Sequence, residues 1–177
     1  MNKISKTNNT RKGKRIVPGS ICGVIAIAIV VLVFSLMRNK ERVVGIDIVE
    51  QDITEFFYTV SSSSYPPAYQ RYRFYKEDGA CQFYHEKREG SNWPLTESNI
   101  TLSGSMELSE EQWKEFVKFL EGGTVKKREE SVEAGNSGPW LYLYWNGDQA
   151  KYQEFSFSSI DVKKSFEEFC AELVMLN

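Results

Sequence analysis

Histidine is almost missing from this sequence, because His85 is the only one in 177 residues. A metal centre or a nucleophile–base pair needs several suitable side chains within a few ångströms of one another. Cys81 is four residues from His85 on the same predicted strand, which separates them by roughly 13 Å at about 3.3 Å per residue. The serine motifs G-x-S-x-G and S-x-x-K are missing from residues 43–177 as well. We therefore predict no catalytic, cofactor-binding or metal-binding residues, and interpret His85 as an ordinary sheet residue.

Cysteine is also scarce, with three residues in the chain. Cys22 lies inside an apolar stretch, which leaves Cys81 and Cys170 as a pair. An even number of cysteines in a domain outside the cytoplasm favours a disulfide, here between a strand and the inner face of the last helix. The alternative is that both are small, buried apolar residues. The sequence leaves the two interpretations open.

Charge is missing from one long segment, the 22 residues Ile16–Met37. As a helix with a rise of about 1.5 Å per residue, this segment would be about 33 Å long and would cross the hydrocarbon core of a bilayer. A cleaved signal peptide would be shorter and would end in small residues, whereas Leu36 and Met37 precede Arg38 here. We predict an uncleaved, single-pass transmembrane helix at Ile16–Met37.

Basic residues flank this segment unequally, with six before it and three shortly after it. The excess predicts that the N-terminus is cytoplasmic and that the C-terminal domain lies outside the cell membrane. The expected organisation is a basic cytoplasmic tail at 1–15, the transmembrane helix at 16–37, a juxtamembrane tether at 38–52 and an extracytoplasmic domain at 53–177.

Within the apolar segment, Gly19 and Gly23 have the small-x-x-x-small spacing that lets two membrane helices approach closely. They are candidate contacts of a helix dimer.

Basic charge is depleted in the rest of the chain. Residues 1–42 hold nine of the 22 Lys and Arg and one of the 24 Asp and Glu, which leaves 13 basic and 23 acidic residues, a balance of −10. A domain of this charge is repelled by phosphate polymers, so we predict that nucleic acid is not a partner.

Two hairpin signals indicate an antiparallel sheet. Asp78-Gly79 separates strands expected at 70–76 and 80–87, and Asn146-Gly147 separates strands expected at 140–145 and 151–158. The first pair would turn Tyr72, Phe74, Cys81 and Phe83 inward. Further strands are expected at 53–61, 100–106 and 124–130, with loops at 61–67, 89–99 and 131–139.

Two helices are also expected. Ser109-Glu110-Glu111-Gln112 is a capping box for a helix at 110–121, which has one apolar stripe and ends before Gly122. A second helix at 162–175 has a stripe of Val162, Phe166, Phe169, Cys170 and Leu173. Because each helix has a single apolar face, we predict a two-layer α+β domain, an antiparallel sheet with two amphipathic helices on one face.

Aromatic residues make up 14% of the chain, and four of them lie in or beside predicted loops: Tyr65, Tyr69, Trp93 and Trp140. Exposed rings beside polar loops can bind sugars or peptides, which makes these four candidate ligand-facing residues. The alternative is that a sheet of this size needs them for its core.

Several short motifs resemble those of uncharacterised small membrane-anchored or secreted proteins of Gram-positive bacteria, a domain of unknown function. The motifs are Tyr72-Arg73-Phe74 before Asp78-Gly79, Leu108 to Gln112, Gly138-Pro139-Trp140, and Gly147-Asp148 before the Phe155/Phe157 strand. The resemblance covers most of residues 70–170. It implies a bacterial cell envelope and carries no activity or site residue with it.

The anchor and the lack of a reactive cluster together predict a non-catalytic binding or accessory domain at the envelope, with a protein or a cell-wall glycan as ligand. Two alternatives stay open. One is an envelope hydrolase that uses paired carboxylates, and the other is a subunit of a transmembrane signalling or transport complex.

Overall fold

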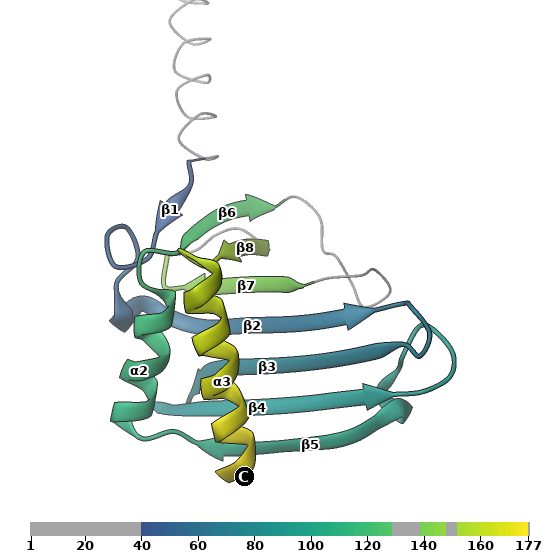
Figure 1. Cartoon of the computed structure of the whole chain (residues 1–177). Helices are drawn as coiled ribbons and strands as arrows, with labels where there is room; N and C mark the ends of the chain where they lie inside the picture. Colours follow the sequence, from purple (N-terminus) through teal and green to yellow (C-terminus); the bar gives the residue numbers. More distant parts are fainter. Residues whose placement is uncertain (1–39, 129–138, 148–151, 177) are drawn as a thin grey trace, which may run out of the picture. The chain divides into compact units, whose positions relative to one another are not determined.

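The computed structural model describes residues 40–128, 139–147 and 152–176. Eight described strands form one antiparallel sheet in the order β1-β6-β8-β7-β2-β3-β4-β5 (Figure 1). The strands are β1 (Arg42–Val43), β2 (Ile53–Ser62), β3 (Ala68–Glu77), β4 (Ala80–Glu89), β5 (Ile100–Glu107), β6 (Thr124–Arg128), β7 (Trp140–Trp145) and β8 (Tyr152–Ser156). The predicted α+β class is confirmed.

Two helices, α2 (Glu110–Leu120) and α3 (Ile160–Leu176), pack on the same face of this sheet (Figure 1). The ring of Phe74 on β3 stacks on Phe116 of α2, with centroids 4.0 Å apart and planes 2° from parallel. The same ring lies 6.3 Å from Phe169 of α3. On β2, Phe56 lies 5.7 Å from both Phe116 and Phe166. One layer of phenylalanines on the sheet therefore holds both helices.

Local sequence signals place the turns and helix ends as expected. Asp78 and Gly79 have φ angles of 51° and 86°, which are the values of a two-residue hairpin turn. Ser109 Oγ accepts the N–H of Gln112 (3.2 Å), and Gln112 Oε1 accepts the N–H of Ser109 (2.9 Å), which completes the capping box. Gly122, at φ 72°, follows α2 as predicted. Short 3-10 turns at Glu50–Asp52 and Glu97–Asn99 precede β2 and β5.

The folded domain begins before residue 53, inside the segment expected to be a tether. Val44 and Ile48 are buried in the core, with 2% and 1% of their surface exposed. The N–H of Val44 donates to the carbonyl of Gly123 (2.9 Å), and the N–H of Gly122 donates to the carbonyl of Val44 (3.0 Å). Residues from Arg42 onward are thus part of the domain. Val44 and Ile48 contribute apolar side chains to the core, and the backbone of Val44 bonds the residues just before β6.

Within the described ranges, no helix is long and apolar enough to cross a bilayer. The segment Ile16–Met37 lies outside those ranges, together with Gly19, Gly23 and most of the loop expected at 131–139. The transmembrane helix stays a prediction.

The shared aromatic layer predicts which phenylalanine the fold depends on. Phe74→Ala removes a ring that contacts both helices, and we expect it to lower the free energy of unfolding by about 3 to 5 kcal/mol. Phe57→Ala, on the neighbouring strand but on the opposite face, should cost clearly less because Phe57 is only half-buried. Urea unfolding followed by tryptophan fluorescence measures both, and equal losses would contradict this account of the core.

Candidate functional site

The sheet face opposite the helices carries the candidate site. Directly paired residues of antiparallel strands share a face. Phe57 pairs with Arg73 on β3 and with Tyr142 on β7, while Arg73 pairs with Tyr84 on β4 and Tyr142 pairs with Glu154 on β8. These five residues form a continuous line across five strands, which we call the central row.

Two parallel rows flank the central row. One contains Trp140, Thr59, Arg71 and Glu86, and the other contains Tyr144, Glu55, Tyr75 and Gln82. We call the three rows together the open face. Most of these side chains are half-buried, and no described helix covers them (Figure 1). The surface therefore combines aromatic rings with arginines and carboxylates, and it is accessible.

Arg73 is the centre of the open face. Its guanidinium carbon lies 4.1 Å from the ring centroid of Tyr75 and 5.5 Å from that of Phe57. Its Nε donates to Glu55 Oε1 at 2.6 Å. Contacts of an arginine with aromatic faces and a carboxylate hold the planar group in one orientation. Arg73 thus fixes the two rings beside it.

Arg71, one row away, has a different set of partners. Its Nε donates to Thr59 Oγ1 (3.2 Å), and its guanidinium carbon lies 5.7 Å from the centroid of Phe57. Among the described residues, no carboxylate is within ion-pair distance of Arg71. Its charge is therefore available to an anionic ligand, whereas that of Arg73 is already matched by Glu55.

A buried ion pair supports the end of the open face near the β4–β5 loop. Arg88 donates to Glu86 Oε1 through Nη2 (2.7 Å) and Nε (3.1 Å), and both side chains are buried. Tyr84 donates its hydroxyl to Glu86 Oε2 (2.7 Å). Burial and then this bond to Glu86 raise the pKa of Tyr84 to about 12. Arg88 Nη1 also reaches the carbonyl of Leu95 (3.4 Å), so the loop is held over the sheet.

The other end of the face has a similar mixture of groups. Tyr142 and Tyr152 have ring centroids 6.1 Å apart. Arg128 on β6 lies 3.3 Å from Glu154 and 5.4 Å from the centroid of Trp140. The aromatic and charged character of the face is thus continuous from β4 to β6.

The four aromatic residues that were expected to face a ligand differ in position and exposure. Trp140 is on the open face and half-buried, and Tyr65 is in the β2–β3 loop with 84% of its surface exposed. Trp93 is half-buried in the β4–β5 loop. Tyr69 is only 2% exposed, because Arg88 stacks on its ring at 4.5 Å, so it supports the face and does not meet solvent. The strand alternation would have identified it as a partner of Arg71 and Arg73.

Most residues of the open face were not found from the sequence. Ligand-facing rings were expected only in or beside loops, whereas the residues of the open face lie within strands, among them Phe57, Arg71, Arg73, Tyr84 and Tyr142. The sequence feature that indicates this surface is the alternation of side chains in β3. Tyr72 and Phe74 face one side of the sheet, and the other side carries Tyr69, Arg71, Arg73 and Tyr75. Arginine beside aromatic residues on the parity opposite the core indicates a surface, not a core.

The cysteines and the histidine lie on the helix-facing side. Cys81 and Cys170 are free thiols in the structure, half-buried and buried respectively. Burial raises the pKa of both, and the predicted disulfide stays a prediction. His85 is 4% exposed and stacks on Phe83 at 5.9 Å, and burial lowers its pKa. In the described part of the chain, no group of three His, Cys, Asp or Glu side chains could hold a metal ion.

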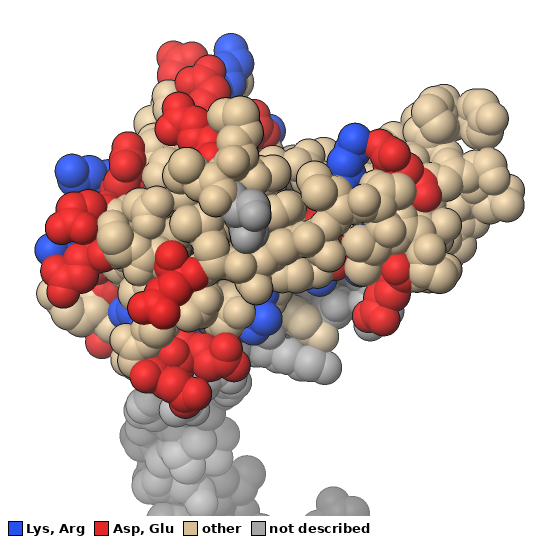
Figure 2. All heavy atoms as spheres, turned by 90° about the horizontal axis from the view of Figure 1, so that it is seen from below, with Lys and Arg blue, Asp and Glu red and all other residues tan. Residues whose placement is uncertain are grey.

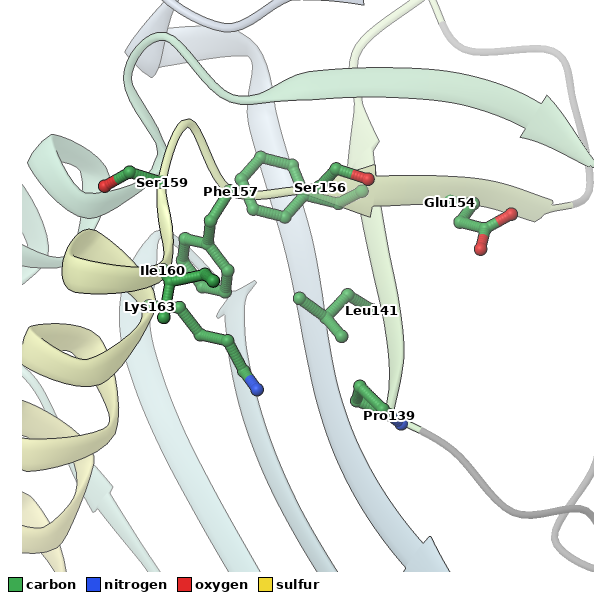
Figure 3. A pocket seen from close by; sticks show the side chains of 9 residues that line it. Pro139, Leu141, Glu154, Ser156, Phe157, Ser159, Ile160 and Lys163 are labelled. Carbon is green, nitrogen blue, oxygen red and sulfur yellow. The ribbon is translucent and has the colours of Figure 1, made fainter.

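A hollow of about 420 Å³ lies between the start of α3 and the strands β7 and β8. Figure 3 shows Lys163 extending from α3 toward Leu141 and Pro139. The amino group of Lys163 is 3.6 Å from Glu167, which also accepts the hydroxyl of Tyr58. Burial, and then the bond to Glu167, raise the pKa of Tyr58. Lys163 is thus matched by a carboxylate of its own helix, and the hollow offers a ligand mainly apolar groups.

No protein-family model, curated protein or solved structure matches this chain.

The two glutamate–arginine pairs of this face should differ strongly in their effect on stability. Glu86→Ala leaves Arg88 buried and unpaired, and we expect a loss of about 3 to 5 kcal/mol in the free energy of unfolding. Glu55→Ala is the matched control, because Glu55 and Arg73 are partly exposed, and an exposed pair contributes at most about 1 kcal/mol. Urea unfolding measures both losses. A small effect of Glu86→Ala would show that the buried pair does not stabilise this end of the sheet.

Proposed function

We propose that this chain is a non-catalytic binding domain whose open face holds a cell-wall glycan. The observation that carries the proposal is the central row, in which Phe57 and Tyr84 lie on either side of Arg73. The two rings are two strands apart, which is about 10 Å at the usual strand spacing. Two linked pyranose rings have this length, so a glycan that crosses the strands would place every second sugar over an aromatic ring.

The chemistry of the open face fits such a ligand. The C–H faces of sugar rings are apolar and pack on the negative faces of aromatic rings. Half-buried rings held by arginine lose little side-chain freedom on binding, which is the property of residues that dominate affinity. Polar groups such as Gln82 and Glu55 lie in the next row and can bond sugar hydroxyls.

Arg71 favours a glycan that carries carboxylates. The domain has a formal balance of −10, so an anionic ligand is repelled by most of its surface. Arg71 is a cation on the open face whose charge no described carboxylate neutralises. A guanidinium of this kind binds a carboxylate through two parallel hydrogen bonds.

The carboxylates of the open face favour binding over hydrolysis. Glu55, Glu86 and Glu154 each lie within 3.3 Å of an arginine. Each of these carboxylates is thus already engaged in an ion pair with a cation of the same sheet. The alternative of a hydrolase with paired carboxylates therefore has no support from this face, and no observation favours a subunit of a signalling or transport complex.

The proposal includes the cell-envelope location. An uncleaved helix at Ile16–Met37, with the N-terminus in the cytoplasm, would hold the domain outside the membrane. The domain begins at Arg42, four residues after Arg38, so such an anchor would keep the domain near the membrane. The resemblance to small anchored proteins of Gram-positive bacteria supports this setting.

Two variants on the open face test the proposal with soluble peptidoglycan fragments as the ligand. We expect Phe57→Ala and Arg71→Ala to lower the affinity of the full-length protein by roughly tenfold or more each, because they remove a stacking ring and an anion-binding group. Lys164→Ala is the matched control, since it removes an exposed cation from α3 on the helix side. Isothermal titration calorimetry in detergent gives the affinities.

A neutral chitin oligosaccharide separates the two contributions. Phe57→Ala should still weaken its binding, whereas Arg71→Ala should not, because this ligand has no carboxylate. Binding that is insensitive to both open-face variants, or no binding of either glycan, would overturn the proposal.

A further inference from the structure

The strand β5 forms one outer edge of the described sheet. Proteins usually protect such edges with lysine, proline, a bulge or a very short strand. The opposite edge, β1, has only two residues. In contrast, β5 has eight residues without lysine, arginine or proline, its one charged residue is Glu107 at the end, and its pairing is irregular only near Ile100. Apart from the irregularity near Ile100, the β5 edge therefore lacks the usual protection against strand addition.

The backbone of β5 presents hydrogen-bonding groups to the outside. The N–H of Leu108, just after the strand, donates to the carbonyl of Cys81 on β4 (2.8 Å). In an antiparallel ladder, residues that bond the partner strand alternate with residues whose N–H and C=O point away from it. From Leu102 onward, the even-numbered residues of β5 thus bond β4, and the backbone N–H and C=O of Ser103 point outward.

The side chains of β5 are complementary to those of a second β5. Leu102 and Met106 lie two residues before and after Gly104, on the same face of the sheet. If two β5 strands pair around a two-fold axis at Gly104, Leu102 of each copy lies opposite Met106 of the other. Gly104 then meets its own copy at a position where Cα atoms are only about 4.5 Å apart, which suits a residue without a side chain.

The surroundings of this edge also fit a second copy. Figure 2 views the molecule from the β5 side and shows an uncharged stretch of surface between acidic groups. In Figure 1, α3 ends at this edge of the sheet. Its last residues, Met175 and Leu176, are 79% and 69% exposed. Two acidic domains can therefore meet here through uncharged and apolar groups.

We propose that a second copy of this chain pairs with the β5 edge and forms an antiparallel, two-fold dimer centred on Gly104. The dimer joins two sheets into one, so the open faces of both copies lie on the same side of a continuous sheet. It does not depend on the identity of the ligand.

The test is sedimentation velocity of the full-length protein in detergent over a range of concentrations. Ser103→Lys places a charge on the outer edge without removing a bond to β4, and we expect it to weaken self-association by roughly tenfold or more. Ser64→Lys adds the same charge in the exposed β2–β3 loop and should leave self-association unchanged. Thermal unfolding should show that both variants are as stable as the unmodified chain.

Crosslinking with a short bismaleimide tests the register. The double variant Leu102→Cys/Met106→Cys should give a covalent dimer above the background of the unmodified chain. Neither single variant should. In this register residue 102 of one copy is offset by four residues, roughly 13 Å, from residue 102 of the other, and the same offset separates the two copies of residue 106. A monomer at every concentration would overturn the proposal. A dimer that survives Ser103→Lys and does not crosslink, but is lost in Gly19→Leu/Gly23→Leu, would overturn it as well.

Discussion

The stacking of Phe74 on Phe116, at 4.0 Å and nearly parallel, is the contact on which the rest of the structure depends. It brings α2 onto β3, and the same ring reaches Phe169 of α3. Because both helices have one apolar face and both use it here, the described chain has no helix left to cover the other face of the sheet. The accessible row of rings and arginines follows from this arrangement.

The same strand register determines both surfaces. In β3, Tyr72 and Phe74 face the helices while Arg71 and Arg73 face away, and a shift of one residue would exchange them. Several aromatic residues of the outer surface are in contact with arginine. Arg73 packs on Phe57 and Tyr75, and Arg128 packs on Trp140. A half-exposed aromatic surface is thus kept rigid without an additional layer of structure.

The sequence predicts the elements better than it predicts the surface. The Asp78-Gly79 turn, the Ser109 capping box and the two helical stripes depend on neighbouring residues, and the structure has each of them. The burial of Val44 and Ile48 depends on β6, far along the chain, and was not predicted. The open face was missed for the same reason, because its rows join residues from five strands whose order the sequence does not specify. Tyr69 is one example. Its position next to a loop suggested that it would be exposed, but the side chain of Arg88 covers its ring.

Hydroxyl-radical footprinting of the full-length protein with peptidoglycan fragments tests the central claim most directly, because it reports the accessibility of individual side chains. The account predicts that oxidation of Phe57, Tyr75 and Tyr142 falls when the glycan is added, while oxidation of Met175 on the helix side stays constant. Protection of Met175 with unchanged oxidation of the three rings would contradict it, since the ligand would then lie on the helices and not on the open face.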